Sequence, residues 1–218
     1  MRPTDSRLCL VTDRHQCSST ALGGDDAVSR LEQAIVLACG AGLRIVQIRE
    51  KDLATGELLS LTRRMHRAAS RARCNVLIND RVDISLAEGL AGVQCAEDGF
   101  PVSDAKEILG PSYVVGASCH SLEAVLHADN AGADWIFLGP VYETHSKRSY
   151  GPPLGVELFS EICQRTTRPV FAIGGITPDR AAECREAGAQ GVAVISSILS
   201  SPDPAVVIKD FEKALGGL

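Results

Sequence analysis

The chain has 218 residues, of which 45% are hydrophobic and 22% are charged, and its formal net charge is −5 at pH 7. This length fits one α/β barrel domain or two small domains. The negative net charge argues against general binding to nucleic acid or anionic membranes, so an anion site needs a local cluster of basic groups. No apolar run approaches the roughly 20 residues of a membrane span, and residues 1–7 show no apolar signal core.

Apolar runs and helical patterns alternate along the chain. The apolar runs predict eight strands, at residues 8–11, 45–51, 75–80, 92–95, 113–118, 135–139, 169–174 and 192–195. Apolar residues at helical spacing predict the helices between and after them, at residues 25–39, 55–73, 82–88, 103–109, 122–131, 154–165, 178–187 and 203–215.

Eight strand–helix units in this length predict a (β/α)₈ TIM barrel that forms a single domain over residues 1–218. An open, doubly wound α/β sheet is the alternative. The barrel is favoured because no GxGxxG turn follows the first strand and because polar residues close every strand.

Eight cysteines are scattered along the chain without a CxxC pair. Four of them, Cys9, Cys39, Cys74 and Cys95, lie in apolar segments, where a reduced cysteine behaves as a small hydrophobic residue. The pattern therefore predicts a reduced, cytoplasmic protein and argues against a zinc site.

The end of the second strand carries Gln47, Arg49 and Lys51. Alternation along an extended chain would point these three side chains the same way. Two cations and an amide on one side suit a phosphate or a diphosphate. In the alternative interpretation, Arg49 and Lys51 are solvated surface cations and Glu50 pairs with one of them.

Polar residues also close the other strands, and active sites of such barrels lie where the strands end. These residues include Asn79, Asp80, Gln94, Ser118, His120, Ser196 and Ser197. Asn79 and Asp80 could instead cap the following helix, and His120 could form a hydrogen bond at a helix start. The convergence of all eight strand ends favours a shared site.

The residues indicate two separate anion sites. Gly174-Gly175 after strand seven and the serines after strand eight match the usual phosphate site of these barrels. The backbone amides near Ser196 and Ser197 are expected to point at the anion from a short helix start. The second site combines Arg49, Lys51 and Lys147 with two amides. The loop over residues 139–155 suits a lid over a phosphate, although a plain surface loop is the alternative. Two anion sites indicate two phosphorylated substrates or one long one.

Five segments, in order along nearly the whole chain, resemble one family. They are QIREK at 47–51, NDRVD at 79–83, SCHS at 118–121, GPVY at 139–142 with Thr144 and Lys147, and GGITP at 174–178. As a set they resemble the thiamine phosphate synthase/TenI superfamily, which implies a (β/α)₈ barrel of the thiamin pathway. Its synthase branch joins hydroxymethylpyrimidine diphosphate to thiazole phosphate and releases diphosphate with Mg²⁺. Its TenI branch includes a tautomerase that aromatises a thiazole phosphate carboxylate.

The resemblance also implies residue roles. The positions that match the diphosphate side are Gln47, Arg49, Lys51, Asn79 and Lys147. Ser118 matches a pyrimidine-side residue, and Asp80 matches one Mg²⁺ ligand. The positions that match the thiazole phosphate side are Thr144, His145, Ser146, Gly175, Ile195 and Ser196.

The end of strand four departs from the family pattern. Synthases commonly read GVHLGQEDxP, whereas this chain reads GVQCAEDGFP at 92–101. Gly99 therefore stands where the second Mg²⁺-binding Asp is expected, and Gln94 stands where the His is expected, a TenI-like choice. Asp98 could replace the missing carboxylate, and Glu97 is another candidate, because Mg²⁺ needs only one or two carboxylates plus substrate oxygens.

Three functions compete. A tautomerase needs one phosphate site and a proton shuttle, for which His120 is suited because its unperturbed pKa lies near neutrality. Such an enzyme would not need Gln47, Lys51 and Asp80 together. A non-catalytic thiazole-phosphate-binding paralogue is supported only by the altered end of strand four. The residues therefore favour a thiamine-phosphate synthase that uses Mg²⁺ and phosphorylated small molecules, with no nucleic-acid or membrane partner; homodimer formation is left open.

Overall fold

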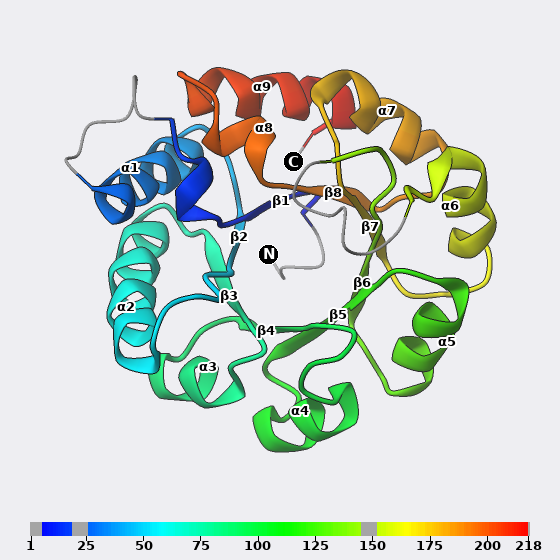
Figure 1. Ribbon diagram of the computed structural model, residues 1–218, viewed down its shortest axis with the longest axis horizontal. Coiled ribbons are helices and arrows are strands. Elements are labelled where there is room, and N and C mark those ends of the chain that lie inside the picture. Colours follow the sequence, from blue (N-terminus) through cyan, green and yellow to red (C-terminus); the bar gives the residue numbers. More distant parts are fainter. Residues whose placement is uncertain (1–5, 19–25, 145–151, 218) are drawn as a thin grey trace.

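The protein folds around a closed barrel of parallel strands. The computed structural model describes residues 6–18, 26–144 and 152–217. Eight strands pair in sequence order, and the last pairs with the first, as Figure 1 shows. They are β1 (Leu8–Val11), β2 (Ile45–Ile48), β3 (Asn75–Asn79), β4 (Gly92–Cys95), β5 (Val114–Cys119), β6 (Trp135–Leu138), β7 (Val170–Ile173) and β8 (Gly191–Val194). The closure confirms the predicted TIM barrel and excludes the open sheet.

Helices surround the barrel on its outer face (Figure 1). They are α1 (Ala27–Gly40), α2 (Thr55–Arg71), α3 (Val82–Glu88), α4 (Val102–Leu109), α5 (Leu122–Asn130), α6 (Gly155–Cys163), α7 (Pro178–Glu186) and α9 (Pro204–Leu215). The 3₁₀ turn η2 (Arg14–Gln16) after β1 was not predicted. The short helix α8 (Ser196–Leu199) after β8 confirms the helix start expected near Ser196 and Ser197. The described residues all belong to this barrel; that residues 1–218 form a single domain stays a prediction.

Side chains of each strand alternate between two apolar cores, as the two-residue repeat of a strand requires. Outward-facing residues pack beneath the helices, and inward-facing residues fill the barrel. The inner core is centred on Trp135, Phe137 and Phe171, whose ring centroids lie 5.2 to 5.7 Å apart. The barrel is therefore a packed core whose chemistry must lie at its rim.

All eight cysteines are free, and seven of them are buried. Burial raises the pKa of the Cys95 and Cys119 thiols to about 12. At neutral pH these side chains are neutral and act as small core residues, as predicted. In the part of the chain that the structure describes, no helix is both long and apolar enough to span a membrane.

Candidate active site

The carboxyl ends of β2 to β5 surround a cavity of about 170 Å³, here called the basic pocket. Its lining comprises Arg49, Lys51, Asn79, Asp80, Ala96, Glu97, Asp98, Gly99, Ser118 and His120. The side chains of Arg49 and Lys51 have no hydrogen-bond or ion-pair partner within the described residues. Two cations that form no ion pair with the carboxylates of the same concave site remain available to bind an anion.

The loop after β2 places both cations. The strand ends at Ile48, so Arg49 and Lys51 lie beyond it rather than on it, yet both still reach the pocket. The backbone N–H of Arg49 donates to Thr12 Oγ1 of the β1 loop at 2.9 Å. This bond anchors the start of the loop to the neighbouring strand end.

Glu50 points away from the two cations. Its side chain is only 2% exposed and accepts hydrogen bonds from the Arg14 backbone N–H at 3.1 and 3.2 Å and from Arg14 Nη1 at 3.0 Å. Arg14 also donates two 2.6 Å bonds to Asp52, whose side chain is 56% exposed. The alternative interpretation, in which Glu50 pairs with Arg49 or Lys51, is therefore wrong. Glu50 instead ties the β2 loop to the β1 loop, a role that the sequence analysis missed.

Asn79 and Asp80 form a hydrogen-bonded chain with Gln47. Gln47 is buried, and its Nε2 donates to Asn79 Oδ1 at 3.1 Å, while Asn79 Nδ2 donates to Asp80 Oδ2 at 2.8 Å. An ionised carboxylate only accepts, so Asp80 fixes the direction of both amides. The N-cap of α3 is Arg81, without a side-chain cap bond. The alternative in which Asn79 and Asp80 cap this helix is wrong.

The Asp80 carboxylate faces the loop after β4. Its backbone is left-handed, with φ of 55°, and Oδ1 accepts from the backbone N–H groups of Ala96 at 2.7 Å and Phe100 at 3.3 Å. Positive φ in a non-glycine residue costs energy and is often kept at functional sites. Because a carboxylate offers about four acceptor positions, one on Oδ2 remains for a cation.

The residues present fit a magnesium ion whose ligands are mainly phosphate oxygens of a bound substrate. No group of three or more His, Cys, Asp or Glu side chains within the described residues could hold a metal alone. Asp80 and Asp98 nevertheless share the basic pocket, and one or two carboxylates suffice when phosphate oxygens complete the shell. Asp98 has no side-chain partner among the described residues, whereas Glu97 Oε2 accepts from the backbone N–H of His120 at 2.8 Å.

A side chain at position 99 would displace the Asp80 carboxylate from the place that it occupies here. A Cβ atom on Gly99 would lie 2.2 Å from Asp80 Oδ1. The glycine therefore lets the Asp80 carboxylate reach the amides of the β4 loop. Of the two substitutes considered from sequence, the unpartnered Asp98 fits the ligand role better than Glu97.

A second hydrogen-bonded chain lies behind the pocket and reaches its lining at Ser118. Gln94 is fully buried, its Oε1 accepts from Trp135 Nε1 at 2.8 Å, and its Nε2 donates to Ser118 Oγ at 3.1 Å. Trp135 was not expected to bear on the site, since its apolar strand indicated only core packing. His120 lies at the rim, with its Nδ1 in contact with the carbonyl oxygen of Gly139.

A second, smaller cavity of about 20 Å³ lies at the ends of β7 and β8 and is here called the glycine pocket. Its lining comprises Thr144, Ile173, Gly174, Gly175, Ile176, Ala193, Val194, Ile195, Ser196 and Ser197. The structure thus brings together Thr144, Gly175, Ile195 and Ser196, as expected for the second anion site. His145, Ser146 and Lys147, which were also expected there or at the basic pocket, lie outside the described residues.

Gly175 is required by packing as well as by any ligand. Its φ is +67°, and an added Cβ would lie 2.7 Å from the Glu143 carbonyl oxygen and 2.8 Å from Tyr142 Cβ. The preceding Gly174 has φ of +97° and lies against Pro140 in the same way. From the sequence, we attributed this glycine pair to close approach of the backbone to an anion. The structure shows that the pair also packs closely against the loop after β6.

Comparisons with known proteins agree with this geometry. The family model described as thiamine monophosphate synthase matches residues 8–198. A relative from Geobacter sulfurreducens is 44% identical over 204 residues, which cover 94% of this chain and 92% of that protein. The chain spans 54% of a thiamine-phosphate synthase from Synechococcus sp. (strain WH7803), with 36% identity over 201 residues and 92% of this chain covered.

Among solved structures, thiamine phosphate pyrophosphorylase from Pyrococcus furiosus superimposes with a TM-score of 0.82. It is 29% identical in sequence, and the match covers 98% of this chain and 96% of that one. The family model, the curated relative and the solved structure agree over nearly the whole described barrel. The chain therefore belongs to the thiamine monophosphate synthase family.

Proposed function

We propose that this chain is a thiamine-phosphate synthase, which joins hydroxymethylpyrimidine diphosphate to a thiazole phosphate and releases diphosphate. The basic pocket carries the proposal, because Arg49 and Lys51 form no ion pair among the described residues and share the cavity with the carboxylates of Asp80 and Asp98. A separate glycine pocket offers a place for the second phosphorylated substrate. Family membership supports the same reaction.

In the proposed reaction, the cations stabilise the departing diphosphate. The bond between the pyrimidylmethyl carbon and the diphosphate oxygen breaks, its electron pair leaves with diphosphate, and the thiazole nitrogen forms the new carbon–nitrogen bond. Negative charge grows on the leaving oxygen, so fixed cations stabilise the transition state more than the bound substrate. Arg49 and Lys51 supply this charge from the β2 loop, and we expect Lys147 to add to it.

The other residues position the reactants. When bound, Mg²⁺ would neutralise part of the diphosphate charge, and Asp80 with Asp98 would hold it. Asn79 lines the diphosphate side, where the buried Gln47 holds it by a hydrogen bond. Ser118 faces the pyrimidine side, where the buried Gln94 holds it in the same way.

The thiazole phosphate would bind with its phosphate group at the glycine pocket, and the residues proposed around it are Thr144, His145, Ser146, Gly175, Ile195 and Ser196. Holding both reactants in line converts a bimolecular step into an effectively unimolecular one. His120 lies at the rim of the basic pocket, and its replacement should matter less because no proton is transferred at carbon.

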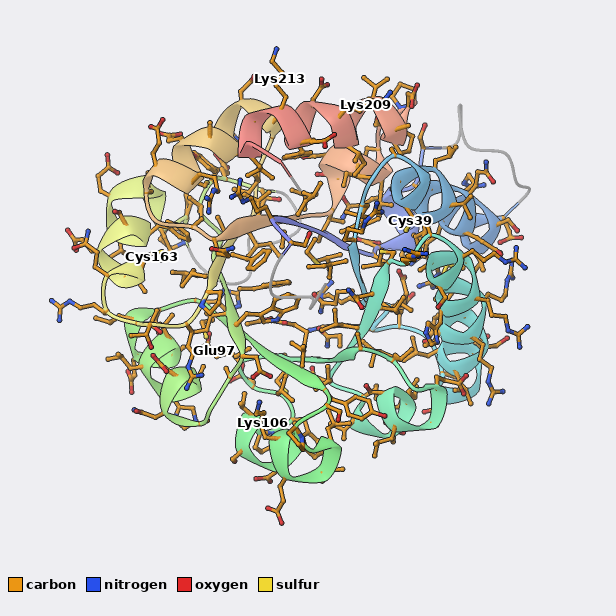
Figure 2. All side chains as sticks on the ribbon, turned by 180° about the vertical axis from the view of Figure 1, so that it is seen from behind. Cys39, Glu97, Lys106, Cys163, Lys209 and Lys213 are labelled. Atoms are coloured by element: carbon orange, nitrogen blue, oxygen red, sulfur yellow. The ribbon has the colours of Figure 1, made fainter. Side chains whose placement is uncertain are left out.

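Alanine replacement of the cations tests the proposal. Arg49→Ala and Lys51→Ala should each lower the rate of thiamin phosphate formation by about 10²–10³, the usual loss when one contact to developing charge is removed. Lys209→Ala is the matched control, because Lys209 lies on α9 and points away from the barrel (Figure 2). Near-normal rates in both site variants would reject the assignment.

A further inference from the structure

The inner hydrogen-bonded chain runs from the middle of the barrel to the basic pocket. Trp135 on β6 donates to Gln94 on β4, and Gln94 donates to Ser118 on β5. Trp135 and Gln94 are both 0% exposed, whereas Ser118 is half-buried and lines the pocket. A fully buried amide normally needs partners for both its oxygen and its nitrogen, and Gln94 has both.

The hydrogen bonds among Trp135, Gln94 and Ser118 can run in only one direction. An indole N–H donates and cannot accept, so the Gln94 oxygen must face Trp135 and its amide N–H₂ must face Ser118. The Ser118 oxygen is therefore an acceptor toward Gln94. Its own hydrogen is left to point elsewhere, and no acceptor for it lies within the described residues.

A glycine makes this arrangement sterically possible. A Cβ atom on Gly116 would lie 1.9 Å from Trp135 Nε1 and 2.0 Å from Gln94 Oε1. Any other residue at this position of β5 would occupy the space of the hydrogen bond itself. The Phe137 and Phe171 rings, with centroids 5.6 and 5.2 Å from that of Trp135, hold the indole in place.

We propose that Trp135 is a positioning residue which, through Gln94, makes Ser118 a hydrogen-bond donor toward the substrate ring. The inference rests on the proposed function, since it concerns the pyrimidine that this pocket would bind. A hydroxyl donor selects a ring atom with a lone pair, such as an unprotonated aromatic nitrogen. It gives no hydrogen bond to a C–H group at the same place. The core tryptophan would therefore set which heteroaromatic rings are accepted.

Binding calorimetry with two probes tests this directly. The probes are hydroxymethylpyrimidine diphosphate and its deaza analogue, in which the ring nitrogen beside the amino-bearing carbon is replaced by C–H. The wild-type protein should prefer the pyrimidine by about tenfold, the factor that one neutral hydrogen bond provides. Ser118→Ala should bind both probes equally.

Two variants break the hydrogen bonds that link Trp135 to Ser118, and two control variants keep them. Trp135→Phe removes the N–H, and Gln94→Met keeps the side-chain size without the amide, so both should lose the preference. Gln94→His should keep it, because a neutral imidazole can accept from Trp135 and donate to Ser118 at once. Phe137→Leu loosens the same aromatic packing and should also keep it. Since Trp135 is the only tryptophan, its single indole N–H signal in NMR spectra reports whether the Gln94 and Phe137 variants retain the bond.

Equal binding of the two probes by the wild type would overturn the inference, and so would a full preference in both Trp135→Phe and Gln94→Met. If Trp135→Phe does not fold, Gln94→Met and Gln94→His still decide between loss and retention. Failure of the proposed function is distinguishable. In that case the wild type discriminates between the probes but forms no thiamin phosphate from the two substrates.

Discussion

The link between the β1 and β2 loops predicts that Glu50→Gln weakens both stability and turnover. The Glu50 side chain is 2% exposed and accepts three hydrogen bonds from Arg14. Glutamine has nearly the same shape, but its N–H₂ group would face a donor. Removing one partner of a buried ion pair lowers the free energy of unfolding by at least about 3 kcal/mol. For a chain of this length, that corresponds to a fall in Tm of roughly 6–12 °C.

The same arginine provides the control. Arg14 also pairs with Asp52, whose side chain is 56% exposed, and exposed ion pairs contribute little. Asp52→Asn should therefore leave Tm nearly unchanged. Thermal unfolding at pH 7 measures both variants, and thiamin phosphate formation below Tm shows whether the cations in the β2 loop have moved. An unchanged Tm in Glu50→Gln would refute the reasoning. So would a fall in Tm for Asp52→Asn as large as that for Glu50→Gln.

Three further predictions concern the metal, the glycine pocket and the thiols. Asp80→Asn should nearly abolish synthase turnover, and Asp98→Asn should raise the Mg²⁺ concentration needed for half-maximal rate; a magnesium titration that is unchanged by Asp98→Asn would remove it as a ligand. Gly175→Val should abolish thiazole phosphate binding in calorimetry, whereas Gly56→Ala, where an added Cβ meets nothing within 4 Å, should not. Burial raises the Cys119 pKa to about 12, so this thiol should resist iodoacetamide at pH 8 and react once unfolded in guanidinium; rapid labelling of the folded protein would contradict this.

Much of the fold could be predicted because its signals are local. Each strand is a short apolar run closed by polar residues, and each helix repeats its apolar residues at helical spacing. The order of these units then leaves few topologies. The 3₁₀ turn η2 escaped prediction because Arg14–Gln16 is too brief to show a period. The expected positions of Asn79, Asp80 and Ser118 at one rim followed from the same rule about strand ends.

The contacts that set direction and charge could not be predicted. Glu50 finds Arg14 36 residues away, and nothing in the local sequence distinguishes this partner from its two cationic neighbours. The Asp80 carboxylate turns toward the β4 loop because Gly99 leaves space there. That glycine looked only like a lost ligand in the sequence. Trp135 shows the same limit, since an apolar strand residue gives no sign that its N–H organises an active-site amide.

The most direct test of the central claim is the rate of thiamin phosphate formation by the purified protein. The reaction contains hydroxymethylpyrimidine diphosphate and thiazole phosphate, with either Mg²⁺ or excess EDTA. With Mg²⁺, we expect thiamin phosphate and an equal amount of released diphosphate. With EDTA, we expect almost no thiamin phosphate. Absence of product with Mg²⁺, together with EDTA-insensitive aromatisation of a thiazole phosphate carboxylate that His120→Ala abolishes, would contradict it and identify a tautomerase.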